Sequence, residues 1–293
     1  MNKPLTPAVI IGCGYIGSLL ADQLTARGQQ VSALVRSQAT YNHLVSRLDT
    51  VQAADLDDPL QLALSTGGSQ LFYFSPPPSM GSTDSRTTHL LQALSKPGKQ
   101  PDRIVYISTT GVYGDCQGRW IDESAPTNAQ VDRAKRRMDA ETQLSAFGKS
   151  LGSEIIIVRV AGIYGPGKLP LKRIAAGDPV VKADQSPYTN RIHAHDLVKM
   201  LDAAMQRGVN GAIYHGCDGS PGKMADYFKA VALKAGLAPP PEITLQEAQK
   251  KLSPGMLSYM SESRRLKNQV TLEALDLTLD YPNLHAGLEH CGL

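Results

Sequence analysis

Features that mark membrane, secreted or nucleic-acid-binding proteins are missing from this sequence of 293 residues. No run approaches the ~20 consecutive apolar residues of a membrane span, and the opening MNKPLTPAVIIG lacks the apolar core of a signal peptide. The four cysteines are widely spaced without a CxxC pair, which argues against a disulfide or zinc framework and for a reducing compartment. The formal charge of +3 is too small to indicate a nucleic-acid or membrane partner.

The composition that remains is typical of a globular protein. Hydrophobic residues make up 42% of the chain and charged residues 19%, which is too apolar for a disordered chain. This length allows one large or two medium domains, and no internal repeat is visible. We therefore expect a cytoplasmic α/β protein that acts on or binds a small molecule.

Short apolar runs rich in β-branched residues recur along the chain, with helix-like segments between several of them. Such runs are typical of strands buried on both faces of a parallel sheet. The first gap has apolar residues at 16, 19, 20 and 24, the spacing of a helix, and Gly28 supplies a helix stop. The expected strands are 9–11, 30–35, 51–53, 71–74, 104–107, 155–158 and 211–216.

This alternation predicts an α/β fold of Rossmann type, a doubly wound parallel sheet, with a smaller C-terminal lobe that completes a substrate cleft. The pattern changes after residue 165, where glycine and proline interrupt the chain, and mostly helical segments follow residue 219. The predicted boundaries are 1–165 for the sheet domain, with 190–218 returning to it, and 166–189 together with 219–293 for the lobe.

A glycine motif lies between the first strand and the first helix. Residues 9–17 read VIIGCGYIG, in which Gly12 permits a tight turn, Gly14 lets a pyrophosphate approach the backbone, and Gly17 lets helix and strand pack closely. The helix N-terminus adds N–H groups and a positive dipole end. The motif predicts dinucleotide binding, and the alternative is a tight turn without a ligand.

The end of the second strand bears on the choice of cofactor. An acidic residue there would accept hydrogen bonds from the 2′-hydroxyl of NAD, but this strand ends ALVRS and offers Arg36. A guanidinium suits a 2′-phosphate, so we predict NADP, with NAD as the second choice; otherwise Arg36 is a solvated surface residue. Asp55, after the third strand, either meets the adenine amino group or caps the next helix.

Five motifs follow one another in a specific order: GCGYIG at 12–17, ISTTGVYGD at 107–115, DESAPT at 122–127, VRVAGIYGPG at 158–167 and RIHAHDLVKML at 191–201. Together they make the chain resemble the extended short-chain dehydrogenase/reductases, the NAD(P)-dependent epimerase/dehydratase family. The resemblance covers roughly residues 8–216. The chain looks most like the atypical subgroup that keeps the cofactor site and lacks the usual active-site residues.

The resemblance implies roles for particular residues. The family's Ser or Thr that holds the substrate oxygen corresponds to Thr109, beside Ser108 and Thr110, all of which could instead make ordinary strand-end hydrogen bonds. The family's acid/base group is the tyrosine of a YxxxK motif, whose lysine holds the nicotinamide ribose and lowers the tyrosine pKa. The segment 128–141 contains no such tyrosine.

Two alignments of that segment are open. Anchoring on Glu141 puts Arg137 at the lysine position and Arg133 at the tyrosine position, whereas another register pairs Val131 with Lys135. Arginine stays protonated at neutral pH, so Arg133 would stabilise an oxyanion or clamp an anionic substrate, and Arg137 would reach ribose hydroxyls or phosphate. The alternative is a solvated basic helix face.

A catalytic reaction would then need another proton carrier. Tyr113 in the VYG turn and Tyr164 in the IYGPG loop are the candidates, and either could be a packed loop aromatic instead. His193 and His195 alternate and could share a metal, but no third ligand at matching spacing is evident in the sequence. We therefore predict no metal.

The sequence thus predicts an NAD(P)-dependent oxidoreductase, or an enzyme similar to epimerases and dehydratases, acting on a carbonyl or alcohol; only the resemblance implies a sugar nucleotide. The alternative is a non-catalytic NADP(H)-binding sensor or regulatory protein, which the missing YxxxK favours. Among protein partners, only a homodimer is left open. The predicted catalytic residues are Thr109, Arg133, Tyr113 and Tyr164, and the predicted cofactor contacts are Gly12, Gly14, Tyr15, Ile16, Gly17, Arg36, Asp55, Leu56, Ser75, Ser108 and Arg137.

Overall fold

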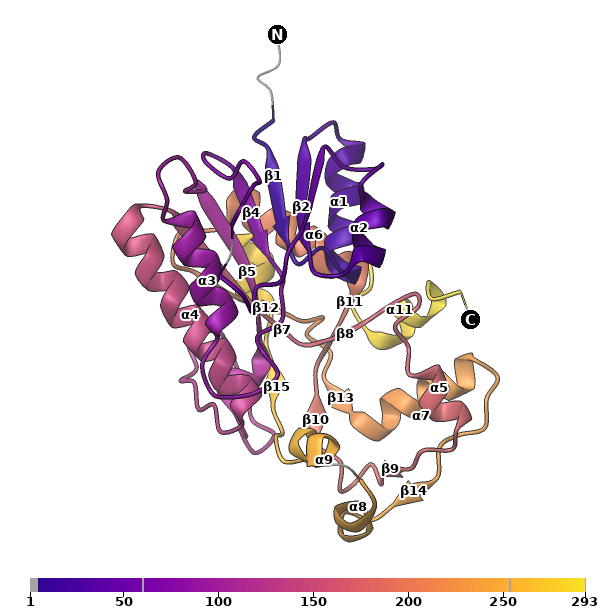
Figure 1. The fold of residues 1–293 in the computed structure, drawn as a ribbon. Coiled ribbons are helices and arrows are strands. Elements are labelled where there is room, and N and C mark those ends of the chain that lie inside the picture. Colours follow the sequence, from indigo (N-terminus) through magenta and orange to yellow (C-terminus); the bar gives the residue numbers. More distant parts are fainter. Residues whose placement is uncertain (1–4, 60, 253, 293) are drawn as a thin grey trace. The chain divides into compact units, whose positions relative to one another are not determined.

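The computed structural model describes residues 5–59, 61–252 and 254–292. The chain divides into two compact units (Figure 1). Unit 1 consists of Met1–Thr109, Asp132–Arg159 and Val198–Tyr214, and unit 2 of Thr110–Val131, Val160–Leu197 and His215–Leu293. The domain boundaries predicted from the sequence stay a prediction, because units defined by contacts need not coincide with domains.

A seven-stranded sheet carries the fold. Its strands are β1 (Ala8–Ile11), β2 (Val31–Val35), β3 (Thr50–Ala53), β4 (Gln70–Tyr73), β5 (Arg103–Thr109), β7 (Glu154–Val160) and β12 (Ile213–Gly216). Their order is β12-β7-β5-β4-β1-β2-β3, and β1 pairs in parallel with both β2 and β4. The chain therefore starts at the centre of the sheet and winds outward in both directions, which confirms the predicted doubly wound α/β fold.

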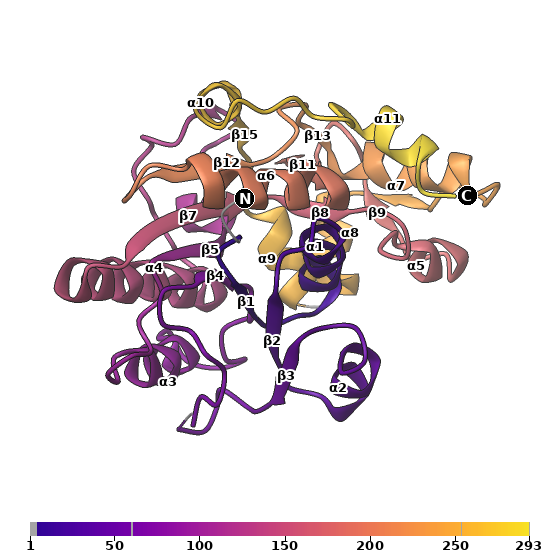
Figure 2. The same ribbon diagram turned by 90° about the horizontal axis from the view of Figure 1, so that it is seen from above.

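Helices cover both faces of this sheet. Figure 2 shows α3 and α4 on one face and α1 on the other. Val9 and Ile11 of β1 are buried in one cluster with Leu71 of β4 and with leucines of α3 and α4. The residues between them, Ile10 and Phe72, are buried as well, which accounts for the short, apolar strands. The helices are α1 (Tyr15–Ala26), α2 (Gln38–Leu44), α3 (Ser85–Leu94), α4 (Asp132–Leu151) and α6 (Ala194–Arg207).

The predicted end of the first helix is confirmed. α1 ends at Ala26, and Gly28 follows it with a φ of +80°, a left-handed conformation that favours glycine. Between β3 and β4, by contrast, residues 54–59 and 61–69 contain no helix.

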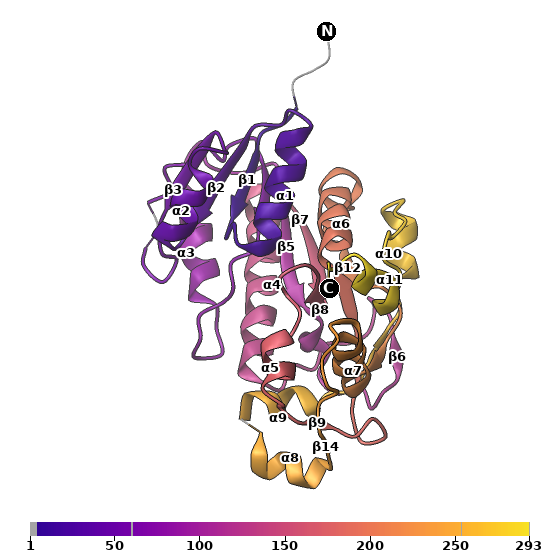
Figure 3. The same cartoon turned by 90° about the vertical axis from the view of Figure 1, so that its right-hand side faces the viewer.

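Unit 2 contains short elements joined into small sheets. Its strand pairs bring distant segments together, and β6 with β15 joins residues near 120 to residues near 265. α7 packs against α5 and α11, all three labelled in Figure 3. The elements are η1 (Thr110–Tyr113), β6 (Trp120–Ile121), β8 (Gly162–Tyr164), α5 (Leu171–Ala175), β9 (Val180–Val181), β10 (Tyr188–Thr189), β11 (Arg191–His193), β13 (Gly222–Lys223), α7 (Met224–Lys234), β14 (Glu242–Ile243), α8 (Leu245–Lys251), α9 (Pro254–Met260), β15 (Arg265–Leu266), α10 (Gln269–Ala274) and α11 (Leu284–Glu289).

None of the helices in the described part of the chain has the length and apolar character needed to cross a membrane.

Candidate functional site

The glycine turn after β1 is packed too tightly for larger residues at two of its three glycines. Gly12 has a φ of +88°, and a Cβ there would lie 2.5 Å from the backbone nitrogen of Ser75. A Cβ at Gly17 would lie 3.2 Å from Cγ2 of Ile10 and 3.3 Å from Sγ of Cys13. These two glycines therefore let the turn pass against the β4 loop and let α1 pack on β1, as the motif predicts.

Gly14 differs from Gly12 and Gly17 because no packing contact among the described residues requires a glycine there. A Cβ at Gly14 would have nothing within 4 Å, and Gly14 lines a pocket together with Gly12, Cys13 and Ser75. Gly14 is the N-cap residue of α1 and offers no side-chain cap, whereas Asp84 caps α3 by accepting from the N–H of Thr87. The uncapped, positive end of α1 at an open pocket suits an anionic group such as a pyrophosphate.

The same pocket extends to the ends of β2 and β3. Arg36, Ser37 and Thr40 line one side. The Arg36 side chain is exposed and makes no hydrogen bond or ion pair within the described residues, while the Ser37 hydroxyl lies 2.8 Å from that of Thr40 and accepts from its N–H. One cation and two hydroxyls thus face the solvent together, and the sequence analysis had singled out only Arg36.

Asp55 and Leu56 line the same pocket. The Asp55 carboxylate accepts a hydrogen bond from the backbone N–H of Asp57 at 3.0 Å, which closes a turn. The alternative that Asp55 caps a helix is wrong, because no helix follows it in 54–59 or 61–69. Its contact with adenine stays a prediction.

Arg86 lines the pocket too, and no sequence motif pointed to it. Its guanidinium lies 2.6 Å from both carboxylate oxygens of Asp57 and donates to the carbonyl oxygen of Pro76 at 3.0 Å. The hydrogen bonds from Arg86 lower the pKa of the Asp57 carboxyl. Arg86 therefore links the proline loop after β4 to Asp57, which lies 29 residues before Arg86 in the sequence.

Arg137 takes the place of the family's lysine in the register anchored on Glu141. From α4, its guanidinium donates to the hydroxyl of Tyr106 at 2.9 Å and to the carbonyl oxygens of Ile107 at 3.0 Å and Ser75 at 3.4 Å. Burial raises the pKa of Tyr106 to about 12, so this hydroxyl stays protonated and accepts from Arg137. The cation lies at the carboxyl ends of β4 and β5, where ligands bind in doubly wound sheets.

Glu141, on which one of the two registers is anchored, is held by two polar contacts. Glu141 accepts from the hydroxyl of buried Ser108 at 2.5 Å and forms a buried ion pair with Arg159 at 2.8 Å. Because α4 residues four apart share a face, Arg133 and Arg137 lie on the side of Glu141. Lys135, the lysine of the other register, is exposed, and its Nζ lies 3.8 Å from Oδ1 of Asp132.

The alternative of a solvated basic face therefore applies to Lys135 and not to the whole segment. Arg136 is buried and donates to the carbonyl oxygen of Gly81, and Arg137 is half-buried in the contacts described above.

The four predicted catalytic residues are divided between the units. Thr109 ends β5 and Arg133 lies in the first turn of α4, both in unit 1 and both half-buried. Tyr113 and Tyr164 are buried within unit 2. The catalytic roles of all four stay predictions.

Both tyrosine hydroxyls have partners inside unit 2. The Tyr113 hydroxyl lies 2.6 Å from Nε2 of His215, whose Nδ1 lies 2.7 Å from the carbonyl oxygen of Lys267. Since a carbonyl only accepts, Nδ1 carries the imidazole proton, and Tyr113 donates to Nε2. Tyr164 donates to the carbonyl oxygen of Asn283 at 3.2 Å, and burial raises its pKa.

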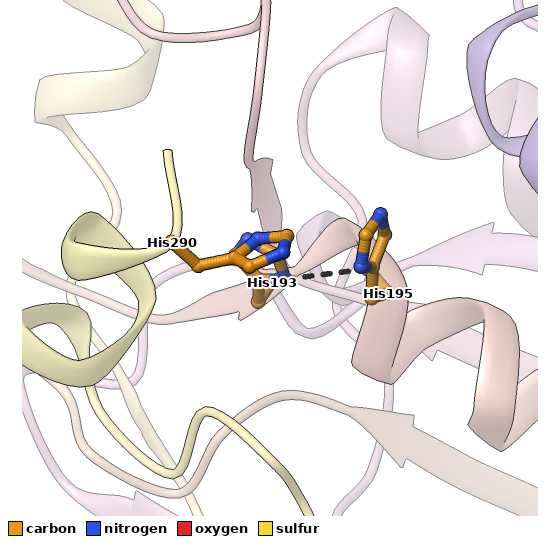
Figure 4. Close-up of side chains that lie close together, drawn as sticks. All are labelled: His193, His195 and His290. Carbon is orange, nitrogen blue, oxygen red and sulfur yellow. Dashed lines mark hydrogen bonds between the residues drawn. The ribbon is translucent and has the colours of Figure 1, made fainter. Parts of the chain in front are cut away.

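A third histidine joins the pair that the sequence suggested. His290 lies beside His193 and His195 in unit 2 (Figure 4). Burial and the two neighbouring histidines lower the pKa of His193 to about 4. His290 lies 95 residues beyond His195 in the chain, which is why no local spacing rule could find it.

Comparisons with known proteins confirm the resemblance to the NAD-dependent epimerase/dehydratase family. The model of that family matches residues 81–215. Protein YeeZ of Escherichia coli K12 is 27% identical over 241 residues, 79% of this chain and 84% of that protein. A functionally unknown conserved protein from Silicibacter pomeroyi superposes with a TM-score of 0.83 at 28% identity, covering 97% of both chains.

The same fold occurs in a sugar-nucleotide enzyme with NAD bound. This is a double mutant of DesIV, a dTDP-glucose 4,6-dehydratase from Streptomyces venezuelae, with a TM-score of 0.78 at 18% identity over 97% of this chain and 95% of that one.

Proposed function

We propose that this chain, a relative of the NAD-dependent epimerases and dehydratases, is a pyridine-nucleotide-dependent oxidoreductase that prefers NADP and acts on a carbonyl or alcohol. The observation that carries the proposal is the open space at Gly14, in front of the uncapped end of α1. None of the described residues fills that space within 4 Å of a Cβ at Gly14, and a diphosphate matches the polarity of the helix end.

The preference for NADP rests on the other end of the pocket. Arg36 is the exposed cation there, with the Ser37 and Thr40 hydroxyls beside it. A guanidinium and two hydroxyls can bind a phosphate dianion, whereas NAD would present only a hydroxyl at this place. Asp55, which lines the same pocket, would accept from an adenine amino group.

At the reactive end, the bound nicotinamide supplies or accepts hydride. Arg137 would donate to the ribose hydroxyls, in the role that a lysine has in the family. Thr109 would donate a hydrogen bond to the substrate oxygen, and Arg133 would stabilise the negative charge that develops on that oxygen. Because Arg133 stays protonated, it cannot deliver the proton, and Tyr113 and Tyr164 stay the predicted proton carriers.

The test is titration of the full-length chain with NADPH and with NADH, followed by fluorescence or calorimetry. We expect tighter binding of NADPH, and Arg36→Ala should weaken NADPH binding at least tenfold while leaving NADH binding unchanged. Arg47→Ala is the matched control, because Arg47 is an exposed arginine that pairs with Asp22 and does not line the pocket. Equal affinity of the parent protein for both cofactors would remove the role of Arg36.

A second candidate is a non-catalytic NADP(H) sensor. It is favoured by one observation: both tyrosine hydroxyls that could replace the missing acid/base group are hydrogen-bonded inside unit 2. Oxidation of NADPH against a panel of simple carbonyls and nucleoside-diphosphate sugars distinguishes the candidates. Turnover that falls in Arg133→Ala with unchanged NADPH affinity supports the enzyme, and tight binding without turnover on any panel member supports the sensor.

A further inference from the structure

Three imidazole rings meet in unit 2 from three separate places in the sequence. His193 ends β11, His195 lies in the first turn of α6, and His290 follows α11 (Figure 4). One ring nitrogen of each lies within 4.8 Å of those of the other two. The ring centroids are 5.3 Å apart for His193 and His195, and 4.8 Å apart for His195 and His290.

The innermost ring has a nitrogen without a partner. The His193 side chain is fully buried, and its Nε2 has no hydrogen-bond partner among the described residues. Its Nδ1 is engaged only by the backbone N–H of His195, at 3.3 Å. A buried polar atom without a hydrogen-bond partner costs free energy. A group that binds Nε2 of His193 would therefore stabilise the site.

A buried carboxylate holds the third histidine's segment beside the other two. Asp196 accepts hydrogen bonds from the backbone N–H groups of Asp280 and Tyr281, both at 2.8 Å. The Tyr281 ring in turn lies 4.0 Å from the His193 ring and 4.9 Å from the His290 ring, between centroids. The three rings are therefore brought together by the fold of unit 2 and not by contacts of the histidines alone.

We propose that His193, His195 and His290 bind one divalent transition-metal ion, and that Zn²⁺ is the best fit among such ions. Neutral imidazole is a preferred ligand of zinc, and three protein ligands leave a fourth position for water. Zinc-bound nitrogens lie about 2.0–2.1 Å from the metal, so the rings must move closer together than they are here. His290 is exposed and can make that movement.

Coordination has one local consequence at His193. Binding through Nε2 places the ring proton on Nδ1, so the 3.3 Å contact from the His195 N–H must open. That contact is long for a hydrogen bond, and its loss is a small cost beside three metal–nitrogen bonds.

The test is calorimetric titration of the full-length, tag-free chain with ZnCl₂ after removal of bound metals. We expect one ion per chain, and His290→Ala should weaken binding at least tenfold. His285→Ala is the matched control, because His285 is an exposed histidine of α11 outside the cluster. An unchanged affinity in His290→Ala, an equal loss in His285→Ala, or no binding by the parent protein overturns the proposal.

X-ray absorption at the zinc edge supplies a second, independent measurement. Three nitrogen ligands at about 2.0 Å are expected in the parent protein, and fewer in His290→Ala. Sulfur ligands would overturn the proposal, since Cys291 adjoins His290 in the sequence. The proposal does not depend on the proposed function, because neither measurement uses a pyridine nucleotide.

Discussion

Glu141 in unit 1 and Asp218 in unit 2 are two buried carboxylates whose surroundings differ. In unit 1 the buried Glu141 is satisfied by Arg159 and by Ser108. In unit 2 one carboxylate oxygen of the buried Asp218 has no hydrogen-bond partner among the described residues. Nε2 of His193 has none there either. Breaking a buried ion pair such as the first destabilises the fold. An unsatisfied buried group can instead bind a proton or a ligand.

The largest expected effect on stability comes from removing Glu141, the carboxylate whose hydrogen bonds are satisfied. Glu141→Ala removes the carboxylate that pairs with the Arg159 cation, and the side chains of this pair are only 5% and 6% exposed. Removing one member of a buried pair typically costs about 3–5 kcal/mol. Urea denaturation followed by circular dichroism should show that loss in the free energy of unfolding.

The control for this prediction is Asp22→Ala. It breaks the exposed pair between Asp22 and Arg47, where about 1 kcal/mol or less is expected. If the two variants lose equal stability, the distinction between buried and exposed pairs fails for unit 1.

The next prediction concerns Asp218, whose carboxylate has one oxygen without a hydrogen-bond partner among the described residues. Burial raises the pKa of this carboxyl to about 7, although Ser220 N–H donates to one of its oxygens at 2.9 Å and the cation of Arg191 lies nearby. The folded protein therefore binds more protons than the unfolded chain between the normal pKa of an aspartate and pH 7. The stabilising effect of the proton is complete below about pH 4 and is lost as the pH rises through 7.

Asp218→Asn should remove this pH dependence. Relative to the variant, the parent protein should lose up to about 4 kcal/mol of unfolding free energy between pH 4 and pH 7, since each pKa unit corresponds to about 1.4 kcal/mol. Asp57→Asn in unit 1 should show the opposite sign, because Arg86 lowers the pKa of Asp57 and that contribution is lost as the pH falls. Slopes of the same sign in the two variants would contradict the comparison.

The sequence predicted the parts of the molecule that depend on neighbouring residues. Strand runs, the glycine turn and Arg36 are local patterns, so the sheet and one wall of the pocket could be predicted. The contacts that complete unit 2 could not: His290 reaches His193 across 97 residues of sequence, and no periodicity carries that information. Arg86 was missed for the same reason, since its partner Asp57 lies on a different loop.

Gly12 and Gly14 separate folding from binding, and Gly14→Ala gives the smallest expected change in stability. Gly12→Ala puts a Cβ 2.5 Å from the Ser75 backbone at a φ of +88°, and such left-handed strain costs about 1–3 kcal/mol. Gly14→Ala meets no protein atom within 4 Å, so the free energy of unfolding should change by about 0.5 kcal/mol or less.

Gly14→Ala, the variant with the smaller effect on stability, should have a large effect on NADPH binding. Gly14→Ala should weaken binding at least tenfold although it leaves the fold intact, because the added methyl group enters the space assigned to the diphosphate. Calorimetric titration and thermal unfolding on the same preparations give both quantities. A Gly14→Ala protein that binds NADPH as tightly as the parent would mean that the open space at α1 is not the diphosphate site, and the proposed function would lose the observation that carries it.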